Sequence, residues 1–217
     1  MAHQKKGGFS MDEKIREEAV GTEEASGTIG KAGTTVKEGI VCSLKGINEI
    51  EAEIVSIVRD TVSNALRATG SVAGEGVNVA KDVVKGAIAA AEEVGTGLTT
   101  GTKSVAKGII MGVSDVGGDV ITVAGTTIRD TIKGAAEVGG DVAVVARRTV
   151  DGVLEATKEI GGNVEEMAKA VVTGAVDAAG AVGTSAIHNV KEMMVGVVEG
   201  VKDVASAALP KPKAGQT

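Results

Sequence analysis

The sequence predicts an all-α protein, and three observations lead to that prediction. First, an apolar residue followed by glycine recurs at 22-residue intervals, at Val94, Val116, Val138, Ile160 and Val182. Second, apolar or small residues within each unit are spaced by fours and then threes, which is typical of an amphipathic helix. Third, the strict alternation that a strand requires is found only briefly. Since 22 residues are two elevens, at about 3.67 residues per turn, the apolar stripe keeps its register along a long helix.

The composition changes along the chain and divides it into four segments. Residues 1–35 are a polar head rich in Gly, Ser, Thr and Glu, in which a short helix could begin at Ser10. Residues 36–71 read as an amphipathic helix, residues 72–209 form the 22-residue repeat array, and two prolines open the tail over 210–217. A fully helical stretch over 36–209 would be on the order of 250 Å long at ~1.5 Å per residue.

The glycine pairs between units leave two helical arrangements open. The apolar phase runs through each pair unbroken, and Glu93, Asp115, Glu137 and Glu159 precede the glycines, where a helix end disfavours a carboxylate. Both points favour one continuous helix, straight or gently hinged. The alternative is an array of separate helices of about 18 residues stacked as hairpins, since Asp, Asn or Ser follows each junction and these residues are good N-caps.

The apolar stripe is the surface that we expect to be buried against something else. The chain has 32 glycines, no Trp or Tyr, and Phe9 as its only Phe, so we expect a thin core and marginal helix stability in water. The stripe consists of Val94, Val116, Val120, Ile128, Ile132, Val138, Val142, Val150, Leu154, Ile160, Val164, Val172, Val176 and Val182.

Glycine and basic residues each recur at fixed positions beside this stripe. Glycines four apart let helix backbones approach closely, and pairs at the junctions could act as hinges. The candidate packing or hinge glycines are Gly108, Gly112, Gly117, Gly118, Gly139, Gly140, Gly161, Gly162, Gly196 and Gly200. Basic residues beside a stripe can cover apolar surface with their stems while the charge stays in water, and the candidates for this interfacial role are Lys81, Lys103, Arg147, Lys169 and Lys191.

No catalytic, cofactor or metal motif stands out in the chain. His3 and His188 are far apart, Cys42 is the only cysteine, and every glycine-rich stretch recurs with the repeat, which a specific catalytic loop would not do. The net charge is -6 with no basic face and no stacking aromatics, which argues against nucleic-acid binding. No stretch is long and apolar enough for a transmembrane helix, and no signal peptide is visible. We therefore expect a cytoplasmic protein that is not an enzyme and has no cofactor.

Two stretches resemble a known class of repeat. GTGLTTGTKSVAKG over 95–108 and AVVTGAVDAA over 170–179 are similar to the eleven-residue repeats of perilipins, and more loosely to those of synucleins, apolipoproteins and late-embryogenesis-abundant proteins. The chain also resembles the low-aromatic helical chains of bacterial phasins, which coat polyester granules. The resemblance covers about residues 72–208. It implies an amphipathic coat on a lipid droplet or storage granule, with no catalytic residues.

Three functions follow as expectations from the sequence. The first is a non-enzymatic coat on an apolar surface such as a lipid droplet, membrane or granule, with the stripe inserted. The second is a structural protein that self-assembles through its glycine and alanine rows into a bundle, filament or shell, and we expect a homo-oligomer. The third is a stress or desiccation protectant.

Overall fold

The computed structural model describes residues 30–44, 50–95, 99 and 101–208, and it is all-helical in this part of the chain, as the sequence predicts. The short helix expected after Ser10 and the tail over 210–217 lie outside the described residues. Eight helices are present in the described part: α2 (Lys31–Leu44), α3 (Ile50–Thr69), α4 (Val72–Val94), α5 (Thr102–Ser114), α6 (Val120–Glu137), α7 (Val142–Glu159), α8 (Val164–Val182) and α9 (Thr184–Ala208).

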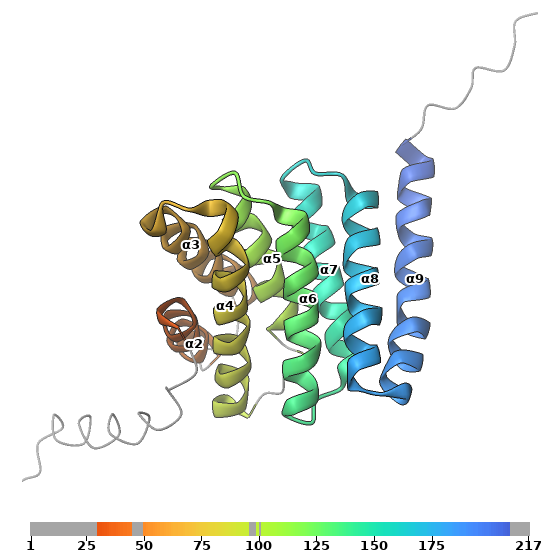
Figure 1. The fold of residues 1–217 in the computed structure, drawn as a ribbon, viewed down its shortest axis with the longest axis horizontal. Coiled ribbons are helices and arrows are strands. Elements are labelled where there is room, and N and C mark those ends of the chain that lie inside the picture. The colour runs from red at the N-terminus through yellow and green to blue at the C-terminus, as the bar shows by residue number, and fades with distance from the viewer. Residues whose placement is uncertain (1–29, 45–49, 96–98, 100, 209–217) are drawn as a thin grey trace, which may run out of the picture.

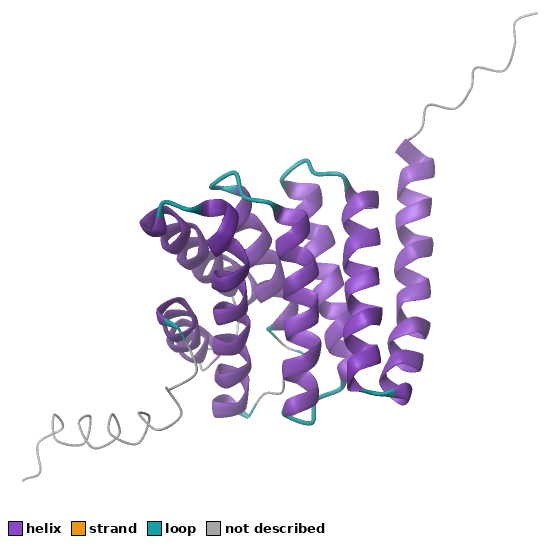
Figure 2. Cartoon of the chain, viewed as in Figure 1, coloured by secondary structure: helices purple, strands orange, loops and turns teal. Residues whose placement is uncertain are grey.

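The helices form a two-layer stack in which α2 to α8 each pack mainly on a helix two places away in the chain. Helices α2, α4, α6 and α8 form one layer, here called the even layer, and α3, α5, α7 and α9 form the odd layer. Figure 1 shows α4, α6 and α8 side by side, with α5 and α7 behind them. The helices from α4 to α9 are joined at alternating ends of the stack (Figure 2).

The expectation of one continuous helix is wrong, because the glycine pairs end the helices. Gly117, Gly139 and Gly161 have φ of +71°, +71° and +72°, a left-handed conformation that glycine adopts without strain. The N–H of the next glycine then donates back into the ending helix, as from Gly140 to the Ala135 carbonyl at 2.7 Å. The sequence alternative, separate helices stacked as hairpins, describes the structure.

The residue after each glycine pair starts the next helix as its N-cap. The Asp141 carboxylate accepts hydrogen bonds from the N–H groups of Ala143 and Val144, at 3.0 and 3.1 Å. Asp119 and Asn163 accept the equivalent pairs of bonds at α6 and α8. Each junction thus closes one helix and opens the next within a few residues.

Three of the four acidic residues that argued for a continuous helix are compensated by cations from other helices. Glu93 pairs with Lys37 at 2.9 Å, and Asp115 pairs with Arg59 at 2.5 Å. Glu159 accepts a hydrogen bond from Lys107 at 2.5 Å. Since these partners lie on other helices, 52 to 56 residues away in sequence, the carboxylates tolerate the helix C-termini near them.

The helix expected over 36–71 is also divided. Its residues belong to two helices, α2 and α3, which pack on each other, and α2 begins at Lys31, inside the segment expected to be a polar head. Both helices join the same stack as the repeats, since α2 packs on α4 and α3 on α5.

The core lies between the two layers and contains much of the apolar stripe. Ile128, Ile132 and Val150 are fully buried, and Leu154 is 8% exposed. Of the other stripe residues, only Val138 and Val182 are exposed, and the rest are half-buried: Val94, Val116, Val120, Val142, Ile160, Val164, Val172 and Val176. The chain therefore covers most of its own stripe, four residues almost completely and eight in part.

Buried hydroxyl groups in this core are mostly satisfied within their own helix. The Oγ1 atoms of Thr131, Thr149 and Thr157 each donate to the carbonyl four residues earlier, at 2.7 to 2.8 Å. Since these bonds satisfy the hydroxyls locally, Thr can take core positions that Val fills elsewhere.

Candidate functional site

The last helix of the stack, α9, is placed differently from the other odd helices. Helix α7 packs more extensively on α5 than on its chain neighbour α6, whereas α9 packs more on α8 than on α7. In Figure 1, α9 stands beside α8 at one end of the stack. Two features distinguish this end of the stack: the face of α9 turned away from the core, and the gap between α9 and α7.

A row of glycines shows how the odd helices normally touch. A Cβ on Gly108 of α5 would lie 2.9 Å from the Val55 carbonyl oxygen of α3, and one on Gly152 of α7 would collide with the Lys103 carbonyl of α5. These backbones are close enough to require glycine. Gly196 of α9 lies 44 residues after Gly152 and so occupies the same position of the repeat. A Cβ on Gly196 would meet no neighbouring atom within 4 Å, and the same holds for Gly200.

A groove of about 440 Å³ lies along α7 and α9 on the odd layer. Its α9 wall includes Gly196, Val197 and Gly200, and its α7 wall includes Arg147, Leu154 and Lys158. The groove exists because α9 does not close onto α7 through its glycine row.

Two valines on the outer face of α9 are the other unusual feature. Val195 is 58% exposed and Val198 is 37% exposed. Val198 occupies the repeat position of Ile110 and Leu154, which are 0% and 8% exposed in α5 and α7. We call the exposed residues His188, Lys191, Glu192, Val195, Val198 and Glu199 the α9 outer face.

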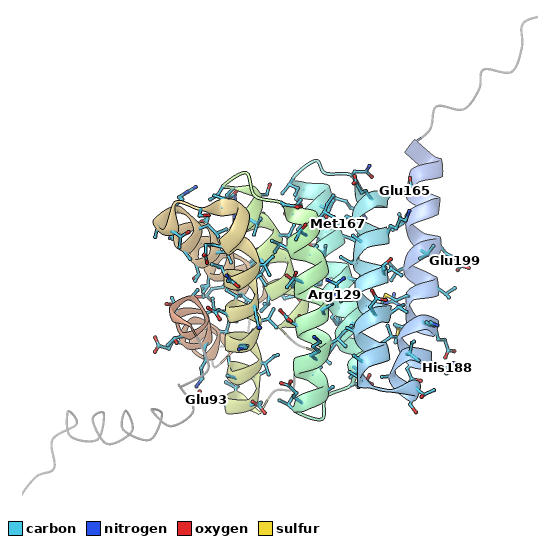
Figure 3. The ribbon with its side chains drawn as sticks, viewed as in Figure 1. Glu93, Arg129, Glu165, Met167, His188 and Glu199 are labelled. Atoms are coloured by element: carbon cyan, nitrogen blue, oxygen red, sulfur yellow. The ribbon has the colours of Figure 1, made fainter. Side chains whose placement is uncertain are left out.

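Figure 3 shows Glu199 on the side of α9 turned away from α8. The repeat position of Val195 is held by Lys107 in α5, which reaches Glu155 and Glu159 of the next odd helix, α7. The α9 outer face is therefore the surface on which a further helix of the stack would pack, and none of the described helices covers it.

Ion pairs cross the odd layer between α5 and α7. Lys103 and Lys107 both contact the carboxylate of Glu155, at 2.6 and 2.7 Å. Hydrogen bonds from Lys103 and Lys107 lower the pKa of Glu155 below its usual range. The two lysines thus share one acceptor and tie neighbouring helices together.

The five basic residues expected at a lipid interface do not lie on one surface. Lys103 pairs with Glu155, and Arg147 lies 3.8 Å from Asp151 in its own helix. Lys81 and Lys169 are exposed on the even layer, and Lys191 is exposed on α9. Although these five basic residues share one position of the repeat, they therefore do not form a single basic surface.

The candidate glycines fall into three groups. Gly117, Gly139 and Gly161, each followed by its partner Gly118, Gly140 or Gly162, form the turns between helices. Gly108 and Gly112 lie against α3, and Gly196 and Gly200 face open space. The sequence pattern alone did not distinguish the covered pair from the uncovered pair, although the 44-residue offset between odd helices relates them.

The described residues include no group of three or more His, Cys, Asp or Glu side chains arranged to hold a metal ion. None of the described helices combines the length and the apolar character that a membrane span requires. His188 is exposed on α9, and Cys42 lies in α2.

The fold and these surfaces define a two-layer stack of helical repeats that ends in an uncovered helix. No family model, curated protein or solved structure matches the chain.

Proposed function

We propose that this chain is a cytoplasmic, non-enzymatic structural protein that associates with copies of itself through α9. The observation that carries the proposal is the exposure of Val195 and Val198, because the equivalent residues of α5 are Lys107, which contacts α7, and Ile110, which is fully buried. Stacked repeats bury a continuous core, and apolar side chains left exposed on an end helix favour further association. A second copy of this chain supplies a helix of matching repeat.

The α9 outer face is suited to pairing with itself in an antiparallel arrangement. If a two-fold axis passes at Val195, a residue four positions before it faces the residue four positions after it in the partner. Lys191 of one copy then faces Glu199 of the other, twice, on either side of the paired valines. Exposed ion pairs contribute only about 0.2 to 1 kcal/mol each, so we expect them mainly to set the orientation.

The outer face of α3, at the opposite end of the stack, is a poorer partner. Its exposed residues include Glu53, Ser56 and Asp60, which offer no apolar surface to the two valines. A two-fold pair is therefore favoured over head-to-tail addition of copies. Such a pair is closed, and it buries a small area, so we expect weak association.

Analytical ultracentrifugation over a range of concentrations tests the proposal on the full chain. We expect the wild type to form dimers as concentration rises, and the double variant V195D/V198D to remain monomeric. Ser56→Asp, on the exposed face of α3, adds a carboxylate at the other end and is expected to behave as wild type.

A charge exchange tests the antiparallel geometry separately. The variant K191E places two carboxylates opposite each other and is expected to weaken the dimer, while K191E/E199K restores the opposite charges and the dimer. A wild type that stays monomeric at every concentration, or a V195D/V198D variant that dimerises equally well, would exclude α9 as the interface.

A peripheral coat on a lipid droplet, membrane or granule is the second candidate. Exposed cations on the even layer, described below, favour attraction to an anionic surface. If the chain coats such a surface, the helices stay stacked, because the stack already covers most of the apolar stripe. We therefore expect the chain to bind the surface without a gain of helix. Flotation with vesicles measures the binding, and circular dichroism measures the helix content with and without vesicles.

A further inference from the structure

The contact between α4 and α6 differs from the other contacts of the even layer at one position. Gly86 of α4 and Gly174 of α8 are 88 residues apart, and each lies against the backbone of the preceding even helix, at Gly33 and Gly125. The position midway between them, 44 residues from each, is Asp130 of α6. A carboxylate side chain therefore lies where the neighbouring helices use glycine to approach their partner.

Asp130 is surrounded by positive charge. Its Oδ2 atom is buried and has no hydrogen-bond partner, and the residue as a whole is half-buried. Burial raises the pKa of the Asp130 carboxyl, while nearby cations act in the opposite direction. These cations, here called the even-layer cation cluster, are Lys81 and Lys85 of α4 and Arg129 and Lys133 of α6.

Comparison with the odd layer shows which acid is replaced by a cation in this cluster. Lys81 and Lys85 lie 22 residues before Lys103 and Lys107, at the same positions of the repeat. In the odd layer those two lysines converge on the carboxylate of Glu155. The residue 22 positions before Glu155 is Lys133, whereas the equivalent of Glu159 is Glu137. The even layer therefore keeps one of the two acids and has a cation in place of the shared one.

The resulting surface has an excess of positive charge that is open to solvent. Lys81, Arg129 and Lys133 are all exposed, and Figure 3 shows Arg129 on α6. The three exposed cations with the Asp130 carboxylate have a formal charge of +2 (3 − 1). Arg and Lys side chains that converge in this way bind phosphate oxygens through charge-assisted hydrogen bonds.

We propose that the even-layer cation cluster is a binding site for a phosphate group, with Lys81, Arg129 and Lys133 as its main ligands. The phosphate takes the place that Glu155 fills in the odd layer and bridges α4 and α6. Inorganic phosphate and the phosphate of an anionic lipid share this chemistry. The site does not depend on association through α9.

Two binding experiments on the full chain test the site and distinguish its sources of phosphate. The first is a titration with inorganic phosphate at constant ionic strength, followed by NMR of the backbone amides. The second is co-sedimentation with phosphatidylcholine vesicles with and without phosphatidylglycerol. Saturable shifts over α4 and α6 support free phosphate as a ligand, and binding only to the phosphatidylglycerol vesicles supports a lipid headgroup.

Charge-matched variants locate the site. The triple variant K81Q/R129Q/K133Q is expected to weaken binding at least about tenfold, which corresponds to ~1.4 kcal/mol. The control R67Q/R148Q/K158Q removes three exposed cations from α3 and α7 and is expected to bind as wild type. Equal losses in both triple variants would mean general charge attraction and would overturn the proposal, as would a wild type that binds neither probe.

A single substitution separates loss of the site from loss of the fold. Lys133→Glu rebuilds the odd-layer arrangement, with one carboxylate facing two lysines. We expect this variant to lose phosphate binding while its melting temperature rises above that of wild type. A K133E variant that retains phosphate binding would contradict the assignment.

Discussion

Glycine has two separate uses in this chain, and the residue scale distinguishes them. At Gly117, Gly139 and Gly161 the backbone has a positive φ that other residues adopt only with strain. At Gly108 and Gly152 the backbone is helical, and glycine is needed because another helix lies where a side chain would be. The second use depends on a neighbour, so the sequence alone cannot identify it.

Gly152 and Gly196 occupy the same repeat position and offer a matched test of this second use. Gly152→Ala would place a Cβ against the Lys103 carbonyl, so we expect the free energy of unfolding to fall by about 1 to 3 kcal/mol. Gly196→Ala meets open space, and we expect no loss or a gain of up to ~1 kcal/mol from helix propensity. Urea denaturation measures both. Equal destabilisation by the two variants would mean that α9 packs on α7 as α7 packs on α5.

At the scale of the element, the junction between helices could be read largely from sequence. A glycine pair followed by Asp119, Asp141 or Asn163 indicates a helix end and a new N-cap, and the structure has both. What misled the prediction was the acidic residue before each pair. Its partners, such as Arg59 for Asp115, lie on other helices, and no local pattern shows that pairing.

The candidate surfaces could be predicted only in part. The fixed position of Lys81 and Lys103 in the repeat is visible in the sequence, but one is exposed and the other is paired with Glu155. Val198 looks like an ordinary stripe residue, and Val195 stands where α5 has Lys107, but the sequence does not show that no helix follows α9 in the described chain. Burial depends on which helices become neighbours, and that information is not local.

The N-cap at Asp141 gives a prediction at this scale. Asp141→Ala removes the acceptor for the N–H groups of Ala143 and Val144, so we expect the free energy of unfolding to fall by about 1 kcal/mol. Asp141→Asn keeps an acceptor oxygen and is expected to stay close to wild type. Thermal unfolding of the two variants makes the comparison. If D141N loses as much as D141A, the charge and not the cap is the source of stability.

At the scale of the whole molecule, ion pairs between helices should make stability depend on pH. A hydrogen bond from Arg59 lowers the pKa of the Asp115 carboxyl. Hydrogen bonds from Lys103 and Lys107 lower the pKa of the Glu155 carboxyl. A carboxyl whose pKa is lower in the folded state than in the unfolded state stabilises the fold at pH values above its unfolded-state pKa of about 4. That stabilisation is lost as the pH falls through the folded-state pKa. We therefore expect the free energy of unfolding to fall as the pH drops from about 5 to about 3.

The double variant D115N/E155Q tests the source of this dependence. It lacks both carboxylates, so we expect lower stability than wild type at pH 7 and a shallower fall on acidification. Urea denaturation at several pH values provides the slope. A variant with the wild-type slope would place the pH dependence in other groups.

Because each helix contacts only its neighbours, stability should vary along the stack, and hydrogen exchange can measure this. Helices α5, α6 and α7 have neighbours on both sides in their own layer, whereas α9 has none beyond it among the described helices. We expect the slowest amide exchange in α5 to α7 and the fastest in α9, in water and without lipid. Adding phosphatidylglycerol vesicles should leave α5 to α7 protected if the stack binds a surface intact. Fast exchange across α5 to α7 in water would instead mean that the apolar stripe is not held inside the stack, and a coat that inserts this stripe into lipid would become the better account.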